Sequence, residues 1–170
     1  MARYRIVPER SRLEAEARSS LHPIRAETTG LEGYFEAELA GDRFGPAVAP
    51  TGCVEIDAER LKTGNFLYDG ELGRRLETRK YPRIRGEVRG VQAIDSGSRH
   101  AVRGALTFHG VTRPVEGEVR VRSVGERTVE IEGELVLDMR HFDLEPPRVL
   151  MLKVYPEVRV RGRVVAERED

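Results

Sequence analysis

The side chains best suited to catalysis or metal binding lie far apart in this sequence. The four histidines are His22, His100, His109 and His141, and the only cysteine is Cys53. Metal sites gather their His and Cys ligands at short, recurrent spacings, and none of those spacings occurs here. The sequence also lacks a nucleophile elbow and a phosphate-binding loop. It therefore predicts a protein that is not an enzyme and that uses no metal and no cofactor.

The strongest pattern in the chain is structural, and it lies in residues 104–121, GALTFHGVTRPVEGEVRV. Leu106 and Phe108 alternate with polar residues, and the same alternation resumes around Val119, after the turn-forming residues 109–114. A period of two is typical of strands that have one dry and one wet face. We predict an antiparallel hairpin here.

Alternation of this kind recurs through most of the chain. The further segments are 12–18, 31–39, 54–58, 83–89, 129–138 and 158–164. They indicate about eight strands, the number that closes into a barrel able to hold one small ligand. The prediction is an all-β, eight-stranded antiparallel β-barrel that forms a single domain over residues 1–170.

Helical patterns are rare in the sequence. In residues 69–80, DGELGRRLETRK, Leu72 and Leu76 lie one helical turn apart, and Pro82 stops the segment. We predict one substantial helix there and a short helical turn over residues 20–26.

Composition excludes several functional classes. The 29 Lys and Arg residues balance the 29 Asp and Glu residues, whereas nucleic-acid-binding proteins usually show a basic surplus. No apolar run is long enough to span a membrane, and the first residues do not resemble a signal peptide. A single cysteine excludes an internal disulfide. We expect a cytoplasmic protein without nucleic-acid partners.

Many inward positions of the predicted strands carry unusually small residues. Two interpretations stay open: the glycines bend strongly curved strands, or small side chains leave a lumen for a ligand. The near absence of polar groups on these faces means that any occupant of a lumen is apolar. The residues concerned are Ala15, Ala17, Gly33, Ala37, Gly86, Gly104, Gly117, Gly133 and Gly162.

Several stretches together resemble the YceI-like family of lipocalin-like barrels, and they occur in the order typical of that family. They are YRIVPERSRLEAEARSSLHPI, GLEGYFEAEL, VEIDAERLKTGNFLYDGEL, RKYPRIRGEV, RGALTFHGVTRPVEGEV and EVRVRGRVVAE. The resemblance implies a lipocalin-like fold that binds polyisoprenoids and similar long amphipathic lipids, and it is consistent with a homodimer.

The strand pattern also predicts which side chains face such a ligand. The alternative for each of them is plain core packing. The predicted wall residues are Leu13, Phe35, Ile56, Ile84, Leu106, Phe108, Val119, Ile131, Leu135 and Val160, and the predicted lid residues across one barrel end are Phe66, Leu72 and Leu76.

Three polar residues are candidates for contacts with the head group of the ligand. His100 lies at a strand end and is an even number of positions from Phe108, so the two side chains share one face of the strand. Arg140 and His141 precede Pro146 and Pro147. The alternative for all three is ordinary surface exposure. Arginine suits an anionic head group, since its guanidinium makes bidentate contacts with phosphate.

These observations favour the non-enzymatic binding, sequestration or transport of a long-chain isoprenoid lipid, either a polyprenyl chain or an isoprenoid quinone. The helix or residues 140–152 would act as the moving gate. The alternative hypothesis is a ligand-free barrel whose charged exterior binds a protein partner in a stress response.

Overall fold

Strands form where the sequence alternates apolar and polar residues, and they dominate the structure. The computed structural model describes residues 1–149 and 151–169. The described residues include α1 (Phe66–Leu76) and 3₁₀ helices at Pro8–Arg10, Ala58–Arg60 and Met139–Phe142. Among them, no helix is long and apolar enough to cross a membrane. The strands are β1 (Ala2–Ile6), β2 (Arg12–Ser19), β3 (Ile24–Thr29), β4 (Glu32–Ala37), β5 (Thr51–Asp57), β6 (Arg83–Ala93), β7 (Arg99–Phe108), β8 (Val111–Ser123), β9 (Thr128–Asp138), β10 (Arg148–Val149) and β11 (Leu152–Arg168).

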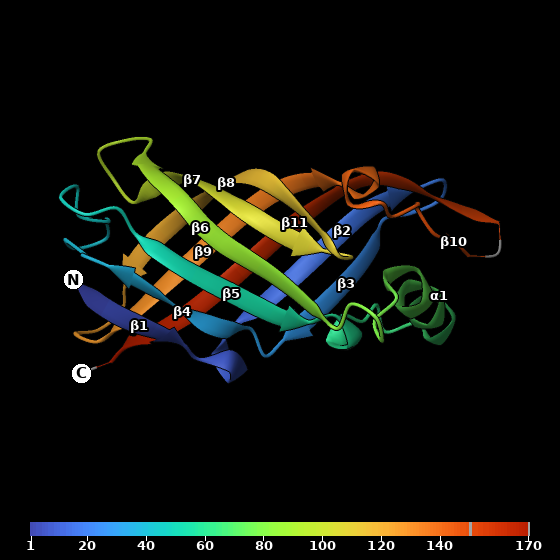
Figure 1. The fold of residues 1–170 in the computed structure, drawn as a ribbon, viewed down its shortest axis with the longest axis horizontal. Helices are drawn as coiled ribbons and strands as arrows, with labels where there is room; N and C mark the ends of the chain where they lie inside the picture. The colour runs from blue at the N-terminus through green and yellow to red at the C-terminus, as the bar shows by residue number, and fades with distance from the viewer. Residues whose placement is uncertain (150, 170) are drawn as a thin grey trace.

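The sheet closes into a barrel because β11 has partners along both of its edges. One edge pairs antiparallel with β9, and the other pairs first with β2 and then with β1. From β1 the ring continues through β4, β5, β6, β7 and β8 to β9 (Figure 1). Because β1–β2 and β3–β4 each behave as one interrupted strand, the wall is an eight-stranded antiparallel barrel, which confirms the predicted fold class.

A buried serine fixes the interruption between β1 and β2. Ser11 is 1% exposed. Its hydroxyl donates a hydrogen bond to the carbonyl of Val7 at 2.9 Å and accepts one from the backbone N–H of Val165 at 3.0 Å. The kinked strand thereby stays attached to β11 where the regular ladder is broken, since a buried backbone N–H requires a partner.

One end of the barrel is closed by a compact apolar cluster. Tyr4 stacks on Phe35 with ring centroids 4.9 Å apart, and Phe44 meets Phe35 edge-on at 6.5 Å. Ala37 and Val121 are fully buried in the same cluster. Both chain termini lie at this end, and α1 and β10 lie at the opposite end (Figure 1).

The helix is confirmed, but its predicted bounds are wrong. The side-chain oxygen of Asn65 accepts hydrogen bonds from the N–H groups of Leu67 and Tyr68, so the helix begins at Phe66 rather than at residue 69. Glu77 takes a left-handed conformation with φ of 49° and ends the helix at Leu76 rather than at residue 80. The N-cap therefore adds almost one helical turn before the predicted start.

The helical turn predicted over residues 20–26 is also wrong. Residues 24–26 belong to β3, which pairs with β2 in antiparallel register. Ala26 and Thr28 are buried in alternation with exposed neighbours, so the period of two overrides the local turn signal. The turn that precedes β3 is closed by the Ser19 hydroxyl, which donates to the carbonyl of His22.

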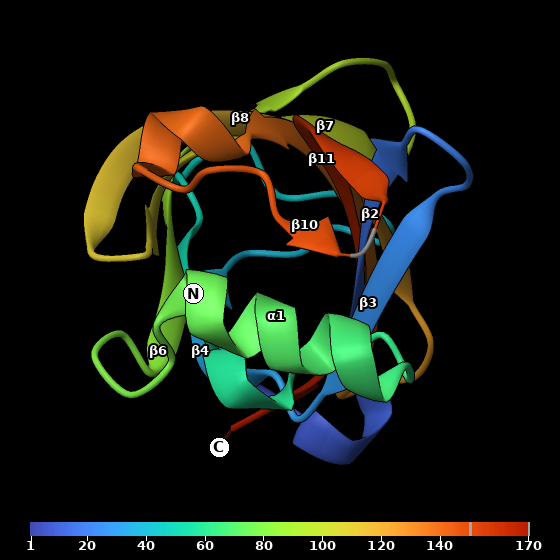
Figure 2. The same ribbon diagram turned by 90° about the vertical axis from the view of Figure 1, so that its right-hand side faces the viewer.

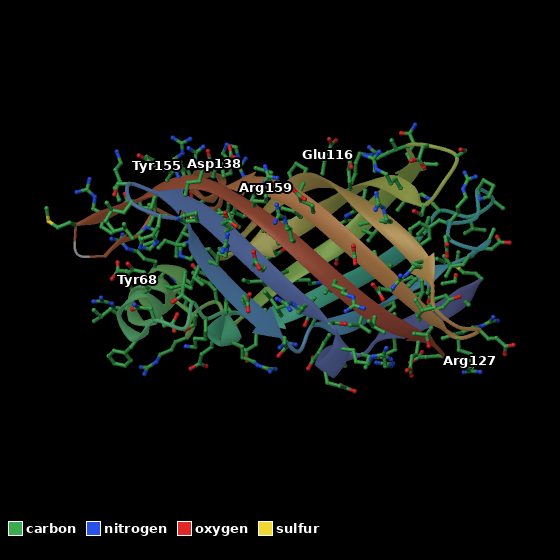
Figure 3. The ribbon with its side chains drawn as sticks, turned by 180° about the vertical axis from the view of Figure 1, so that it is seen from behind. Tyr68, Glu116, Arg127, Asp138, Tyr155 and Arg159 are labelled. Carbon is green, nitrogen blue, oxygen red and sulfur yellow. The ribbon has the colours of Figure 1, made fainter. Side chains whose placement is uncertain are left out.

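Opposite charges pair across neighbouring strands on the outer face of the barrel, where Glu116 and Arg159 project outward (Figure 3). Most of these pairs are exposed and contribute little to stability. The exception is Glu130, whose side chain is 8% exposed and accepts hydrogen bonds from Arg163 at 2.8 and 2.9 Å and from Arg122 at 3.1 Å. These partners, Arg163 first, lower the pKa of Glu130 to about 2.

We expect Glu130→Gln to lower the free energy of unfolding at pH 7 by about 1–2 kcal/mol, because the charged hydrogen bonds weaken while the arginines stay half exposed. A lowered folded-state pKa stabilises the fold above the unfolded-state value. The difference between wild type and variant should therefore vanish between about pH 4.5 and pH 2. Urea unfolding at several pH values measures it. Glu134→Gln, which removes an exposed pair on the same strand, should change stability much less at every pH.

Candidate functional site

An apolar cavity of about 460 Å³ occupies the interior of the barrel. This volume lies within the range of small-molecule sites. Inward residues of β2, β4, β5, β6, β7, β8, β9 and β11 form its wall. Small residues such as Ala15, Gly86 and Gly162 alternate around it with larger ones such as Leu106 and Ile131. The sequence-predicted inward faces therefore enclose a lumen rather than a completely filled core.

Nearly all of the apolar residues predicted to face a ligand lie on this wall. The exception is Phe66, which is 89% exposed. It is the first residue of α1 and lies two positions, about 200° around a helix, from the cavity-facing Tyr68. Whether the wall residues contact a ligand stays a prediction. Those that line the cavity are Leu13, Phe35, Ile56, Leu72, Leu76, Ile84, Leu106, Phe108, Val119, Ile131, Leu135 and Val160.

One end of the cavity, which we call the mouth, is covered by α1 (Figure 2). Tyr68, Leu72, Arg75 and Leu76 form the face of the helix that lines the cavity, and their spacing is that of one helical stripe. Figure 3 shows Tyr68 at this end of the molecule, with Tyr155 and Asp138, and Arg127 at the other. The mouth therefore combines apolar contacts with a phenol and a guanidinium.

Arg75 is paired within the mouth, mainly with Glu71, a carboxylate that it shares with Arg74. Its Nε donates to Glu71 Oε1 at 2.8 Å, and one of its terminal nitrogens lies 3.8 Å from Glu145. Arg75, and to a lesser extent Arg74, lowers the pKa of Glu71. Thr63 adds a hydroxyl to the wall nearby and donates it to Asp69 at 2.7 Å. These polar groups suit hydrogen bonding to a polar head group better than neutralisation of a highly charged one.

Tyr68, Arg75 and Thr63 line the cavity but are not among the residues predicted from the sequence. A helix predicted to begin at residue 69 leaves Tyr68 in a loop, whereas the direction of Arg75 already follows from Leu72, three residues earlier on the same helical stripe. The signal that could have placed Tyr68 is Asn65, an N-cap residue type whose position brings Tyr68 into the helix, four residues before Leu72.

His100 is buried near the closed end and does not line the cavity. It is 2% exposed. Its Nδ1 lies 3.0 Å from the carbonyl of Ser98, and its Nε2 accepts the backbone N–H of Phe44 at 3.4 Å. The predicted role at an opening and the alternative of a solvent-exposed histidine are both wrong, because the loop after β4 folds over this ring.

Arg140 and His141 also lie outside the cavity. Arg140 is bound to Asp138 through two nitrogens, with the shorter contact at 2.6 Å, and this pairing lowers the pKa of Asp138 to about 2. His141 is exposed. The same region still contributes to the mouth, through the apolar residues Met139, Leu144 and Pro147.

His109 connects the mouth elements to one another. It lies in the turn between β7 and β8, with Nε2 2.7 Å from Glu77 Oε2 and Nδ1 3.0 Å from the carbonyl of Phe142. Both partners are hydrogen-bond acceptors. Its position ties the C-terminus of α1 to the 3₁₀ helix at Met139–Phe142.

Within residues 1–149 and 151–169, no three His, Cys, Asp or Glu side chains come together in a way that suits a metal ion.

Comparisons with known proteins agree with this geometry. The sequence matches the YceI-like domain over residues 4–166, and a search of curated proteins finds no match. The structure is similar to BcnA of Burkholderia cenocepacia, with a TM-score of 0.79 at 16% identity, over 94% of this chain and 98% of that one.

Two further solved structures share the fold. A polyisoprenoid-binding domain from Saccharophagus degradans, implicated in plant cell wall breakdown, has a TM-score of 0.75 at 16% identity and covers 99% of this chain and 100% of its own. The YceI protein of Campylobacter jejuni has a TM-score of 0.65 at 15% identity, over 86% of this chain and 85% of that one. At these identities the likeness establishes the fold alone.

Proposed function

The chain belongs to the YceI-like domain family, and on that premise we propose that it binds a long-chain isoprenoid lipid, a polyprenyl chain or an isoprenoid quinone, in the barrel cavity without altering it chemically. The observation that carries the proposal is the nearly all-apolar wall, which ends in a mouth with a few polar groups. The polyisoprenoid-binding domain of Saccharophagus degradans, which has the same fold, supports the choice of ligand class.

The driving force for such binding is burial of apolar surface. Each methylene group that leaves water contributes roughly 0.8 kcal/mol, so a prenyl chain needs no strong polar anchor. Part of this gain is offset by the ordering of a flexible chain. A preformed cavity lined by residues such as Leu13, Val119 and Leu135 adds little cost of its own.

The two ends of the cavity favour one orientation of the ligand. The inner end is lined by Phe35, Phe44 and Pro50, whereas the mouth carries the hydroxyls of Tyr68 and Thr63 and the guanidinium of Arg75. A lipid would therefore enter tail first and leave its head group at α1. Because Arg75 is already paired with Glu71, an uncharged hydrogen-bond acceptor such as a quinone carbonyl fits this end well.

Exchange of the ligand would require movement at the mouth. α1, Leu144 and Pro147 line it, and His109 joins Glu77, just after α1, to Phe142 at one side. The proposal includes storage or transport as the consequence of binding and release. The cytoplasmic location and the homodimer stay predictions from the sequence.

Mass spectrometry of the purified protein tests the proposal. Gentle purification, extraction with organic solvent and analysis of the extract are expected to yield a prenyl lipid in stoichiometric amount. Protein that emerges empty should take up added prenyl quinones. An empty extract together with no uptake would contradict the proposal and favour a ligand-free barrel that binds a protein partner.

A further inference from the structure

Five of the ten large apolar side chains that are exposed among the described residues, including the three most exposed, gather around the mouth. We call these five residues the mouth rim; their exposed fractions run from 42% for Tyr155 to 94% for Met151. Such side chains cost solubility and need an explanation when they cluster. The members of the mouth rim are Leu21, Phe66, Leu67, Met151 and Tyr155.

Three separate segments bring the mouth rim together. Leu21 lies in the turn between β2 and β3, and Phe66 and Leu67 begin α1. Met151 lies just before β11, and Tyr155 is the fourth residue of that strand. The backbone N–H of Ser20 donates to the carbonyl of Lys153 at 2.8 Å, and the Lys153 N–H donates to the Ser20 hydroxyl at 3.0 Å. α1 packs beside β10. Figure 2 shows these elements around one barrel end.

The same segments carry a positive balance in a chain that is neutral overall. Residues 18–25 contain two basic residues and no acidic one, and residues 62–80 contain five basic and three acidic ones. Residues 143–157 contain two basic and three acidic ones, so the three segments together have nine basic and six acidic residues. Arg18, Lys62, Arg79 and Arg148 among them are exposed. Lys153 lies over the ring of Tyr155, 6.0 Å from its centroid. Apolar side chains surrounded by cations are the composition of a surface that binds anionic lipid head groups.

We propose that the mouth rim docks on the surface of an anionic phospholipid bilayer, with its apolar side chains in the interface. This inference rests on the proposed function, because a long apolar chain can then pass between bilayer and cavity without crossing water. Continuity between the mouth rim and the cavity mouth supports a lipid surface over a protein partner. Tyr155 and Phe66 suit the boundary between head groups and acyl chains.

Vesicle co-sedimentation tests the docking surface. The protein is mixed with vesicles of phosphatidylcholine alone or of phosphatidylcholine with phosphatidylglycerol. We expect binding to the anionic vesicles that weakens at high salt, and a loss of about tenfold or more for the double variant Phe66→Ser with Met151→Ser. The control is Ile94→Ser with Val124→Ser, which removes exposed apolar side chains (43% each) from the β6–β7 and β8–β9 turns, away from α1 and β10, and should bind like wild type.

Two results would overturn the proposal: absence of binding to anionic vesicles, or equal losses for both double variants. Light scattering tests a second copy of the chain as the alternative occupant. If wild type is a dimer, the Phe66→Ser, Met151→Ser variant is a monomer and neither binds vesicles, the mouth rim is a dimer interface instead.

Uptake of a prenyl quinone separates this proposal from the one on which it rests. We expect the mouth-rim variant to take up quinone added from ethanol as wild type does, but to take it up from anionic vesicles about tenfold more slowly. Vesicle binding without uptake by wild type would mean that the lipid-binding function fails while docking stands. Normal uptake from ethanol without vesicle binding would mean that docking fails while the lipid-binding function stands.

Discussion

Replacement of Gly162 by phenylalanine is expected to weaken ligand binding about 100-fold while the barrel stays folded. Gly162 lies on the cavity wall in β11, between Leu13 of β2 and Gly133 of β9. A Cβ atom there would have Arg12 O, at 3.8 Å, as its nearest neighbour, which is ordinary contact. The ring would therefore point into open space and displace about four methylene groups of ligand, or about 3 kcal/mol of apolar burial.

The measurement is titration with a prenyl quinone, accompanied by urea unfolding. Arg161→Phe is the matched control, because it adds the same ring to the same strand on the outer face, where Arg161 is 56% exposed. Its affinity should equal that of wild type. Unchanged affinity in a folded Gly162→Phe protein would show that the ligand does not occupy the cavity.

Period-two patterning located the cavity wall because a strand has only two faces, and one of them is dry. The alternation shows which face of a strand a residue occupies, but not how far along the barrel axis it lies. Ala37 shares the inward parity of Phe35, yet it is buried in the closed-end cluster and does not line the cavity. Depth depends on where the chain folds over the barrel end, and this is a tertiary property.

The polar residues show the same limit more severely. His100 has the inward parity of Phe108, but the Phe44 backbone and the Ser98 carbonyl satisfy its ring. Nothing in the local sequence says that the loop after β4 reaches β7. Tyr68 and Arg75 were within reach of prediction. Arg75 lies on the helical stripe of Leu72 and Leu76, and Tyr68 joins that stripe once Asn65 is recognised as the residue that caps α1.

The structure separates the two interpretations of the inward glycines position by position. A Cβ atom on Gly104 or Gly117 would lie 2.5 or 2.6 Å from a backbone carbonyl of the neighbouring strand, so these glycines permit close strand approach. At Gly162 a Cβ atom meets nothing closer than 3.8 Å, and at Gly86 nothing closer than 3.4 Å. These two leave space in the lumen, whereas Gly104 and Gly117 are required by the close approach of the neighbouring backbone.

Gly33 and Gly86 give the sharpest test of that distinction. They flank Val54 on one rung of the sheet, since Gly33 of β4 and Gly86 of β6 both pair with it. Gly33 has a φ of 140°, and a Cβ atom there would lie 2.1 Å from the carbonyl oxygen of Cys53. We expect Gly33→Ala to lower the free energy of unfolding by about 3 kcal/mol or more, because strained backbone and steric overlap add.

Gly86→Ala should instead leave stability unchanged or raise it by about 0.4–1 kcal/mol, because alanine reduces the entropy of the unfolded chain at a position where it fits. Its Cβ would touch only Val54 Cγ1, at 3.4 Å. Urea unfolding of the two variants measures the contrast. Equal stabilities would mean that the backbone of β4 relaxes at no cost. The close approach of β4 to β5 would then be a consequence of small side chains, and the barrel would not require it in order to close.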